Sequence, residues 1–201
     1  MIQIYGPKMS SAFRCYWLLE ELGIPYEIMP FDFSKGDSQN PEYLKLNPNG
    51  KVPTMVDDGF VLWESMAINY YLMEKYNAMY LVGENLQQHA EVNKWTMWSL
   101  TDLYESVHAL IIQKFGNLSE SDFIKAAREQ RLPKYLTVLE NHLVGKENVA
   151  LNKFTMADIA TMSVVMMAEF INFNLSSYPN ILRWKKSMSE RPAFKKAAPQ
   201  A

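Results

Sequence analysis

Residues 47–68 restrict the fold more than any other stretch, because they encode two strands, the hairpin between them and the start of a helix. A Pro/Asn/Gly turn precedes the strand that begins at Lys51-Val52-Pro53, and Asp57-Asp58-Gly59 supplies hairpin turn chemistry. Pro53 is unusual there, since proline removes a donor from the strand ladder and marks a bend or an exposed edge. Val52 beside such a bend can present its N–H and C=O outward, where an extended peptide can pair by strand addition.

A helix start follows the second of these strands directly. Glu64-Ser65 opens an apolar run, and the free N–H groups and dipole of a helix N-terminus favour an anion. Simple capping of the helix by Ser65 is compatible with ligand binding. The edge at Val52 and the helix start together predict a socket for an extended small peptide that carries a carboxylate.

The rest of the first eighty residues alternates between strand and helix patterns. The order β-α-β-α-β-β-α predicts a mixed sheet with helices packed on it. The expected strands are 2–5, 26–33, 52–56 and 60–63. The expected helices are a first one that Ser10 or Ser11 caps and that runs to about residue 22, then 41–46 and 65–75. Gly23 is the natural stop of the first helix.

From about residue 87 the hydrophobic periodicity becomes helical throughout. The expected helical segments are 87–115, 119–143, 155–172 and 180–190. The fold class is therefore α/β plus all-α, with an α/β domain at 1–79, a linker at 80–86 and an all-α domain at 87–201.

Composition excludes several classes of protein. The 201 residues are 48% hydrophobic and carry a net charge of −2 without a Lys/Arg run, which argues against nucleic-acid binding. A single cysteine, Cys15, rules out an internal disulfide and makes a thiolate zinc cluster implausible, and the three histidines lack metal-ligand spacing. The N-terminus has no signal pattern, and the apolar segment 159–168 is too short to span a bilayer. We expect a soluble, cytoplasmic protein without a metal site or a membrane partner.

Residues 48–68 resemble the glutathione-binding half of the cytosolic glutathione transferase family. The resemblance extends over nearly the whole chain, in four pieces with the family's order and spacing. Besides residues 48–68, these are Ser10, Arg14 and Trp17 with the run 18–27, then 154–160, and then 178–184 with 191–193. The chain is identified on these pieces as a member of the family, of bacterial type and with a serine-type active site.

The resemblance implies a thioredoxin-like N-terminal domain, an all-α C-terminal domain, a cis Pro53 and a homodimer with its active site near the interface. It also implies glutathione as cosubstrate and no further cofactor. In the socket, Val52 and Pro53 would face the cysteinyl unit of glutathione, and Lys51 would approach the glycyl carboxylate. Ser65 would take the γ-glutamyl carboxylate and Glu64 the ammonium group.

The catalytic group must favour the thiolate of glutathione, because the thiolate is the nucleophile. Lowering a thiol pKa of about 8.5 by two units takes about 2.7 kcal/mol, which a hydroxyl donor and a helix N-terminus can supply together. Ser10 holds the place of the catalytic serine in the serine-type branches. Ser11 and Tyr5 are the alternatives, the latter at the position of the tyrosine-type branches. Cys15 falls inside the helix and is expected to be a small buried hydrophobe.

The substrate side of the site is less determined. Met9 and Phe13 from the active-site loop, with Trp98, Tyr104 and His108 from the helical domain, are the candidates for an electrophile pocket. Thr155 to Asp158 is a capping box with a structural role.

The expected function is conjugation of glutathione to small hydrophobic electrophiles. The alternatives are glutathione-dependent peroxide or disulfide reduction, and a non-catalytic interaction protein of the same fold.

Overall fold

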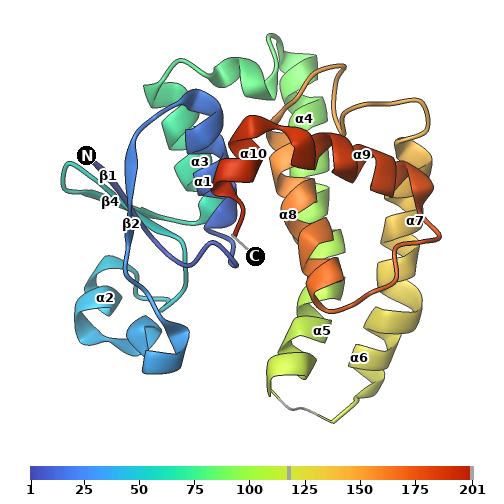
Figure 1. Ribbon diagram of the computed structural model, residues 1–201, viewed down its shortest axis with the longest axis horizontal. Helices are drawn as coiled ribbons and strands as arrows, with labels where there is room; N and C mark the ends of the chain where they lie inside the picture. Colours follow the sequence, from blue (N-terminus) through green and yellow to red (C-terminus); the bar gives the residue numbers. More distant parts are fainter. Residues whose placement is uncertain (117–118, 200–201) are drawn as a thin grey trace. The chain divides into compact units, whose positions relative to one another are not determined.

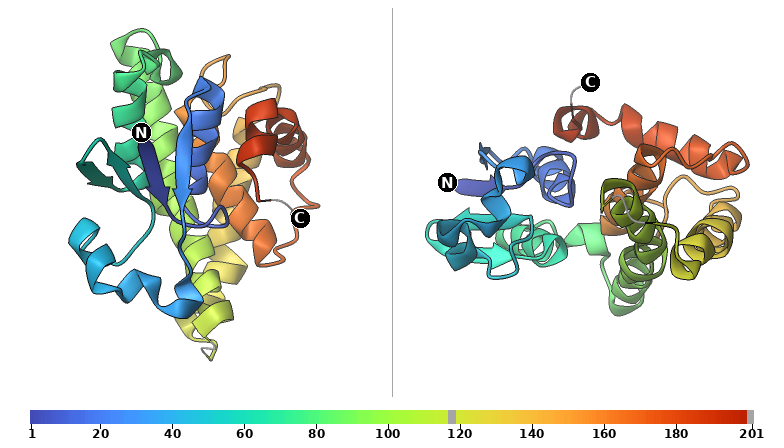
Figure 2. Two further views of the ribbon diagram at one scale, coloured as in Figure 1. Left: turned by 60° about the vertical axis from the view of Figure 1, so that its left-hand side comes forward. Right: turned by 90° about the horizontal axis from the view of Figure 1, so that it is seen from below.

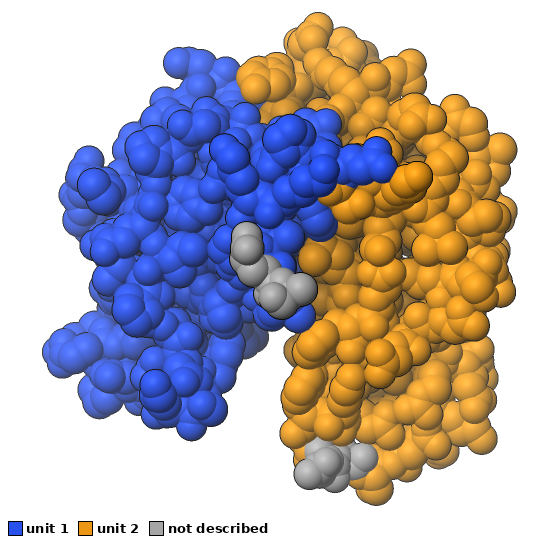
Figure 3. All heavy atoms as spheres, in the orientation of Figure 1, with its two compact units in different colours: residues 1–79, 190–201 blue, residues 80–189 orange. Residues whose placement is uncertain are grey.

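Two units can be distinguished in the computed structural model, which describes residues 1–116 and 119–199. Residues 1–79 and 190–201 form the first unit, and residues 80–189 form the second (Figure 3). The helical domain expected at 87–201 thus contains a last segment that belongs to the first unit. Residues 117–118 and 200–201 of that domain lie outside the described part of the chain.

The first unit is built on a mixed four-stranded sheet in the order β2-β1-β3-β4 (Figure 1). Its strands are β1 (Ile2–Tyr5), β2 (Tyr26–Met29), β3 (Thr54–Asp57) and β4 (Phe60–Trp63). β2 runs parallel to β1, whereas β3 is antiparallel to both β1 and β4. This confirms the predicted mixed sheet and the hairpin at Asp58-Gly59.

Helix α1 (Phe13–Leu22) forms the core of this unit, because every residue from Phe13 to Leu19 is buried. It packs against α3 (Ser65–Lys75) and against α10 (Pro192–Ala197), while α2 (Pro41–Leu46) follows a pair of short 3₁₀ turns. Gly23, with φ at +66°, ends α1 in the left-handed conformation that glycine adopts without strain.

Helix α10 is missing from the sequence-based prediction, and its contacts explain why it forms. The Phe194 ring meets the Trp17 ring edge-on with a centroid distance of 5.0 Å. Arg191 donates to both carboxylate oxygens of Glu21 at 2.7 and 2.8 Å, so a bidentate ion pair joins the start of α10 to α1. These partners are about 170 residues away in the chain, where local periodicity gives no signal.

Three predicted boundaries in the first unit are wrong by a few residues. The first helix begins at Phe13 with Ala12 at its N-cap in place of Ser10 or Ser11, because the two serines lie in a turn that precedes it. The strand expected at 26–33 ends at Met29, because Pro30 follows and cannot donate to the ladder. The strand expected at 52–56 begins at Thr54, after Pro53.

The second unit is helical throughout its regular structure, as predicted. Its helices are α4 (Leu86–Trp98), α5 (Tyr104–Gly116), α6 (Asp122–Ala126), α7 (Leu132–His142), α8 (Met156–Phe170) and α9 (Pro179–Glu190), the last of which ends at the unit boundary. π-Helical segments at Ser99–Leu103 and Ala127–Arg131 make α4–α5 and α6–α7 into two long rods, the first of which is seen along its length in Figure 2. No helix within residues 1–116 and 119–199 is long and apolar enough to cross a membrane.

A buried carboxylate organises the core of the second unit. Asp158, in the first turn of α8, has no solvent-exposed surface. Its Oδ1 accepts from the Val149 N–H at 2.8 Å and from the Trp184 indole N–H at 3.1 Å, and its Oδ2 accepts from the Thr155 N–H at 2.9 Å. One side chain thus joins the start of α8 to the preceding loop and to α9. Burial raises the pKa of Asp158 to about 6, and the donated hydrogen bonds oppose that rise.

Replacing Asp158 with alanine should destabilise the protein by about 3 kcal/mol or more, because the buried groups that donate to it would lose their acceptor. Urea denaturation followed by circular dichroism measures the change. Asp122→Ala is the matched control, since Asp122 is an exposed carboxylate in the first turn of α6, and it should cost less than about 1 kcal/mol. Equal losses in the two variants would contradict the structural role assigned to Asp158.

Candidate active site

The chain at Lys51–Pro53 is held from the inside by a buried polar cluster. Asn47 Nδ2 donates to the Lys51 carbonyl at 2.7 Å, and the Tyr43 hydroxyl donates to the same oxygen at 2.5 Å. Both side chains also contact Thr54 Oγ1, Asn47 at 3.1 Å and Tyr43 at 2.9 Å. Asn47 is 2% exposed, so these bonds are shielded from water. The carbonyl of Lys51 is therefore turned inward, while the Lys51 side chain is exposed.

The backbone of Val52 is the expected docking edge for a peptide. The Val52–Pro53 bond is cis, which confirms what the family resemblance implies. The Val52 N–H donates to no acceptor within the described residues, whereas its carbonyl accepts from the Ser11 hydroxyl at 2.7 Å. A ligand acceptor can therefore pair with the N–H directly, and a ligand donor would share the carbonyl with Ser11.

Gly6 allows the loop before α1 to approach Val52 closely. Its φ is +135°, and a Cβ at this position would lie 2.9 Å from both the Ala12 Cβ and the Val52 Cβ. Side chains other than hydrogen do not fit at that distance. The glycine at the end of β1 therefore brings the Ser10-Ser11 turn next to the edge at Val52.

The start of α3 carries the second half of the predicted socket. Glu64 is exposed and occupies the N-cap with φ at +74° and ψ at 114°, a strained conformation for a residue with a side chain. Such strain persists where the surrounding structure imposes it, and it clusters at ligand clamps. Ser65, the first residue of α3, is 5% exposed.

Arg14 supplies a positive charge behind this helix start. Its guanidinium Nη1 donates to Ser65 Oγ at 3.1 Å, and Arg14 itself is 5% exposed. Because the oxygen of Ser65 accepts this bond, its hydroxyl proton can be given to an anion. The N-terminus of α3 and the Arg14 charge add up at one point, where both favour a carboxylate.

The two serines before α1 have different surroundings. Ser10 Oγ donates to the Pro7 carbonyl at 2.6 Å and accepts from the Ala12 N–H at 3.2 Å. The accepted N–H polarises the hydroxyl and makes it a better donor. Ser11 instead gives its proton to the Val52 carbonyl, so it joins the turn to the docking edge.

Tyr5 belongs to an aromatic cluster at the end of β1. Its ring lies 5.7 Å from that of Tyr43, which in turn lies 4.8 Å from that of Phe31. These rings line a pocket together with Pro30, Asp37, Asn40, Glu42 and Leu46. Tyr5 and Gln3 alternate along β1 with the buried Ile2 and Ile4, so the Tyr5 side chain lies on the other face of the strand.

The candidates for the electrophile pocket are distributed over both units. In the first unit Met9 is 57% exposed, whereas Phe13 is 3% exposed and packs edge-on against Phe194 at 5.4 Å. In the second unit Trp98 meets Trp95 edge-on at 5.1 Å, and Tyr104 stacks on His108 at 5.0 Å along α5. Phe13 thus contributes mainly to the core of its own unit.

Histidines and acidic residues form no metal site in the part of the chain that the structure describes: no group of three His, Cys, Asp or Glu residues lies close enough together to hold an ion. His142 stacks on Trp95 with a centroid distance of 3.8 Å and bonds the Val149 carbonyl at 2.6 Å, while His89 bonds the Gly83 carbonyl at 3.1 Å. Both rings have structural roles.

Several supporting contacts were not predicted from the sequence. Asn47 and Tyr43 orient Lys51, and Arg14 connects α1 with Ser65, across 51 positions of the chain. An asparagine before proline is a turn signal, and it gives no hint that its amide reaches four residues ahead into a buried cluster.

The first unit has a thioredoxin-like sheet, a cis proline beside a Val52 N–H with no acceptor among the described residues, and a helix start that favours an anion. With the helical unit that follows, these are the features expected of a glutathione-binding protein. Comparisons with known proteins identify the family. The model of the glutathione S-transferase N-terminal domain matches residues 2–74, and that of the C-terminal domain matches residues 101–197.

Individual relatives agree with these matches. Glutathione S-transferase 3 of Schizosaccharomyces pombe is 33% identical, with 98% of this chain and 87% of the relative covered. Glutathione S-transferase D7 of Drosophila melanogaster is 31% identical, with 92% and 83% covered. A glutathione transferase family member from Pseudomonas fluorescens, crystallised with two glutathione molecules bound, has a TM-score of 0.88 and 26% identity, with 98% and 91% covered. The chain belongs to the glutathione S-transferase family and is a glutathione transferase.

Cys15 should be unreactive in the folded protein. It is fully buried, and burial raises the pKa of its thiol more strongly than the neighbouring Arg14 lowers it, so almost no thiolate is present at neutral pH. Iodoacetamide at pH 7.5 should leave the native protein unmodified by mass spectrometry and should label it once in denaturant, because the chain has one cysteine. Labelling of the native protein at the rate of the denatured chain would contradict this.

Proposed function

We propose that this glutathione transferase binds glutathione along Val52 and the start of α3, and adds its sulfur to small apolar electrophiles. The observation that supports this most directly has two parts. The Val52 N–H has no acceptor within the described residues, and Arg14 places a positive charge at the start of α3 by its hydrogen bond to Ser65. Both lie within residues 2–74, the part of the chain that the N-terminal domain model matches.

Each part of glutathione has a partner in this arrangement. The cysteinyl backbone pairs with Val52 next to Pro53, which leaves the sulfur near the Ser10-Ser11 turn. The glycyl carboxylate lies near the exposed Lys51 side chain. The γ-glutamyl carboxylate takes the Ser65 hydroxyl and the free N–H groups of α3.

Two further contacts complete the binding proposal. Glu64, exposed at its strained position, accepts from the γ-glutamyl ammonium. Met9, Phe13, Trp98, Tyr104 and His108 remain the candidates for the electrophile pocket. On the ground of family membership, the proposal includes a homodimer in the cytoplasm.

Ser10 is the proposed activating group. Its oxygen already accepts from the Ala12 N–H, and its O–H can turn from the Pro7 carbonyl to donate a hydrogen bond to the thiolate when glutathione binds. A hydrogen bond to a charged acceptor contributes about 1.5–3 kcal/mol, which is the size needed to lower the thiol pKa by one to two units. Ser11 and Tyr5 remain the alternatives.

Ser10→Ala should lower kcat/KM with an aromatic halide by about 10- to 100-fold, because the thiolate loses a donor. The pH profile of kcat/KM should shift upward, since the pKa of bound glutathione rises. Ser11→Ala and Tyr5→Phe are the matched controls, in which the pH profile should stay in place.

An unchanged profile in Ser10→Ala with a shift in either control would assign activation to that control residue. Peroxide and disulfide substrates are measured in parallel, because the same thiolate would reduce them. A wild-type protein that binds glutathione but turns over none of these substrates would favour the non-catalytic alternative.

Asn47→Ala should weaken glutathione binding by about tenfold, because the Lys51 carbonyl loses an inward hydrogen bond and the docking edge becomes mobile. Isothermal titration calorimetry with glutathione measures the effect. Asn141→Ala, an exposed asparagine in the last turn of α7, is the control and should bind as the wild type does. An unchanged dissociation constant in Asn47→Ala would contradict the role of this cluster in positioning Val52.

A further inference from the structure

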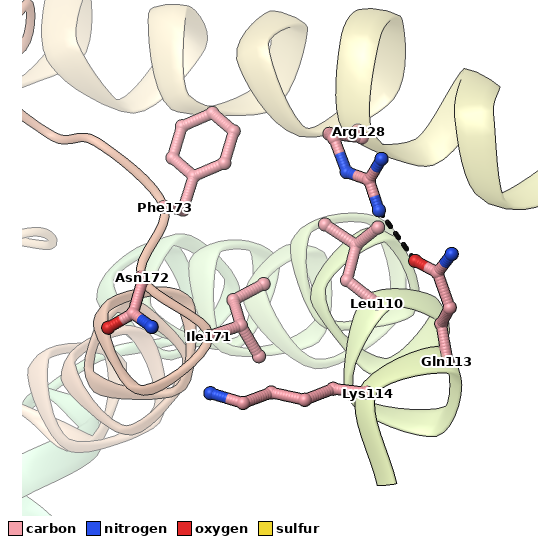
Figure 4. Close-up of a pocket in the computed structure, with 7 residues that line it drawn as sticks. All are labelled: Leu110, Gln113, Lys114, Arg128, Ile171, Asn172 and Phe173. Atoms are coloured by element: carbon pink, nitrogen blue, oxygen red, sulfur yellow. Dashed lines mark hydrogen bonds between the residues drawn. The ribbon is translucent and has the colours of Figure 1, made fainter. Parts of the chain in front are cut away.

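A second pocket lies wholly within the helical unit, with a volume of about 280 Å³ (Figure 4). It is formed by one side of α5, by the π-helical segment Ala127–Arg131 and by the chain just after α8. All of its residues fall between 110 and 173. None of them takes part in the proposed glutathione socket.

The pocket has an apolar floor and a rim of hydrogen-bond donors. Leu110, Ile171 and Phe173 supply the floor, and Figure 4 shows Leu110 on its helix and the other two on the chain that follows α8. Leu110 is 5% exposed, while Ile171 and Phe173 are half-buried. The rim consists of Gln113, Lys114, Arg128 and Asn172.

The Arg128 guanidinium is oriented by two neighbours. One of its nitrogens donates to Gln113 Oε1 at 2.6 Å, and the other donates to Glu120. Because the Gln113 oxygen is occupied by Arg128, its amide nitrogen is left to face other acceptors. A guanidinium has five N–H groups, so these two bonds leave donors for a ligand.

Lys114 places a second positive charge on the rim of the pocket, next to the C-terminal end of α8. Its ammonium donates to the Phe170 carbonyl at 3.0 Å, at the C-terminus of α8, where the helix dipole is negative. The N–H groups of Ile171, Asn172 and Phe173 are used in closing that helix end. The donors that remain for a ligand are therefore side chains, two of which carry a positive charge.

We propose that this pocket binds a small organic carboxylate with a flat apolar body. The carboxylate would accept from Arg128 and Lys114, and the body would lie on Leu110, Ile171 and Phe173. Donors outnumber acceptors on the rim, so a ligand with acceptor oxygens satisfies more of it than a cation or an alcohol does. The volume fits a single aromatic ring with its carboxylate.

Fluorine NMR titration of the full-length protein with 4-fluorobenzoate tests the proposal. We expect one saturable site with a dissociation constant of roughly 1 mM, as befits so small a ligand. Amide shifts in a ¹⁵N-labelled sample should map to Leu110, Ile171 and Phe173. 4-Fluorobenzyl alcohol, which has the same ring without the carboxylate, should bind at least about tenfold more weakly.

Arg128→Met and Lys114→Met should each weaken binding by about tenfold or more, since each removes a charged donor. Lys125→Met is the matched control, because Lys125 is an exposed lysine of α6 outside the pocket, and it should leave the affinity unchanged. Glu120→Gln should tighten binding, since the competing carboxylate on Arg128 is removed.

Three outcomes would overturn the proposal. The first is a titration with 4-fluorobenzoate that does not saturate at about twenty times the expected dissociation constant of roughly 1 mM. The second is equal affinity for 4-fluorobenzoate in the wild type and both Met variants. The third is displacement of 4-fluorobenzoate by glutathione. The last would place the ligand in the glutathione socket instead. Circular dichroism verifies that the variants fold, and their surface positions make unfolding an unsuitable explanation for lost binding.

Discussion

The buried hydrogen bond between Arg14 and Ser65 sets the geometry on which the proposed glutathione socket depends. It joins the first turn of α1 to the first residue of α3, and so fixes two helix N-termini relative to one another. The turn proposed to activate the thiol lies before the first of these helices, and the start proposed to bind the carboxylate belongs to the second. A buried cation is costly unless its donors are used, so Arg14 favours the one arrangement in which Ser65 faces it.

Buried polar side chains that hold two parts of the chain together occur elsewhere in the molecule as well. Asn47 holds the Lys51 carbonyl inside the first unit, and Asp158 collects three N–H donors inside the second. In each case one short polar side chain, sealed from water, satisfies nearby backbone groups, and Asp158 also reaches the Trp184 indole of another helix. Apolar packing makes these units stable, whereas the buried polar groups decide which segments meet, because an unpaired partner would be expensive.

Much of this structure follows from local sequence signals. The mixed sheet, the Asp58-Gly59 hairpin, the helical second unit and the capping box at Asp158 all rest on turn residues and periodicity, which act within a few positions. The contacts of Arg14 with Ser65, and of Arg191 with Glu21, lie 51 and 170 positions apart, and no local pattern encodes them. Of the site, the socket residues could be proposed from sequence, whereas the buried groups that orient them could not.

Helix α10 has a consequence for the order in which the protein matures. Phe194 covers Trp17 and Phe13 in the core of the first unit, yet residues 80–189 are synthesised between them. Domains generally fold in the order in which they leave the ribosome. Here the unit that is translated first completes its core last, after the helical unit has emerged. The nascent sheet domain therefore lacks the α10 cover over the aromatic face of α1 throughout the synthesis of the helical unit.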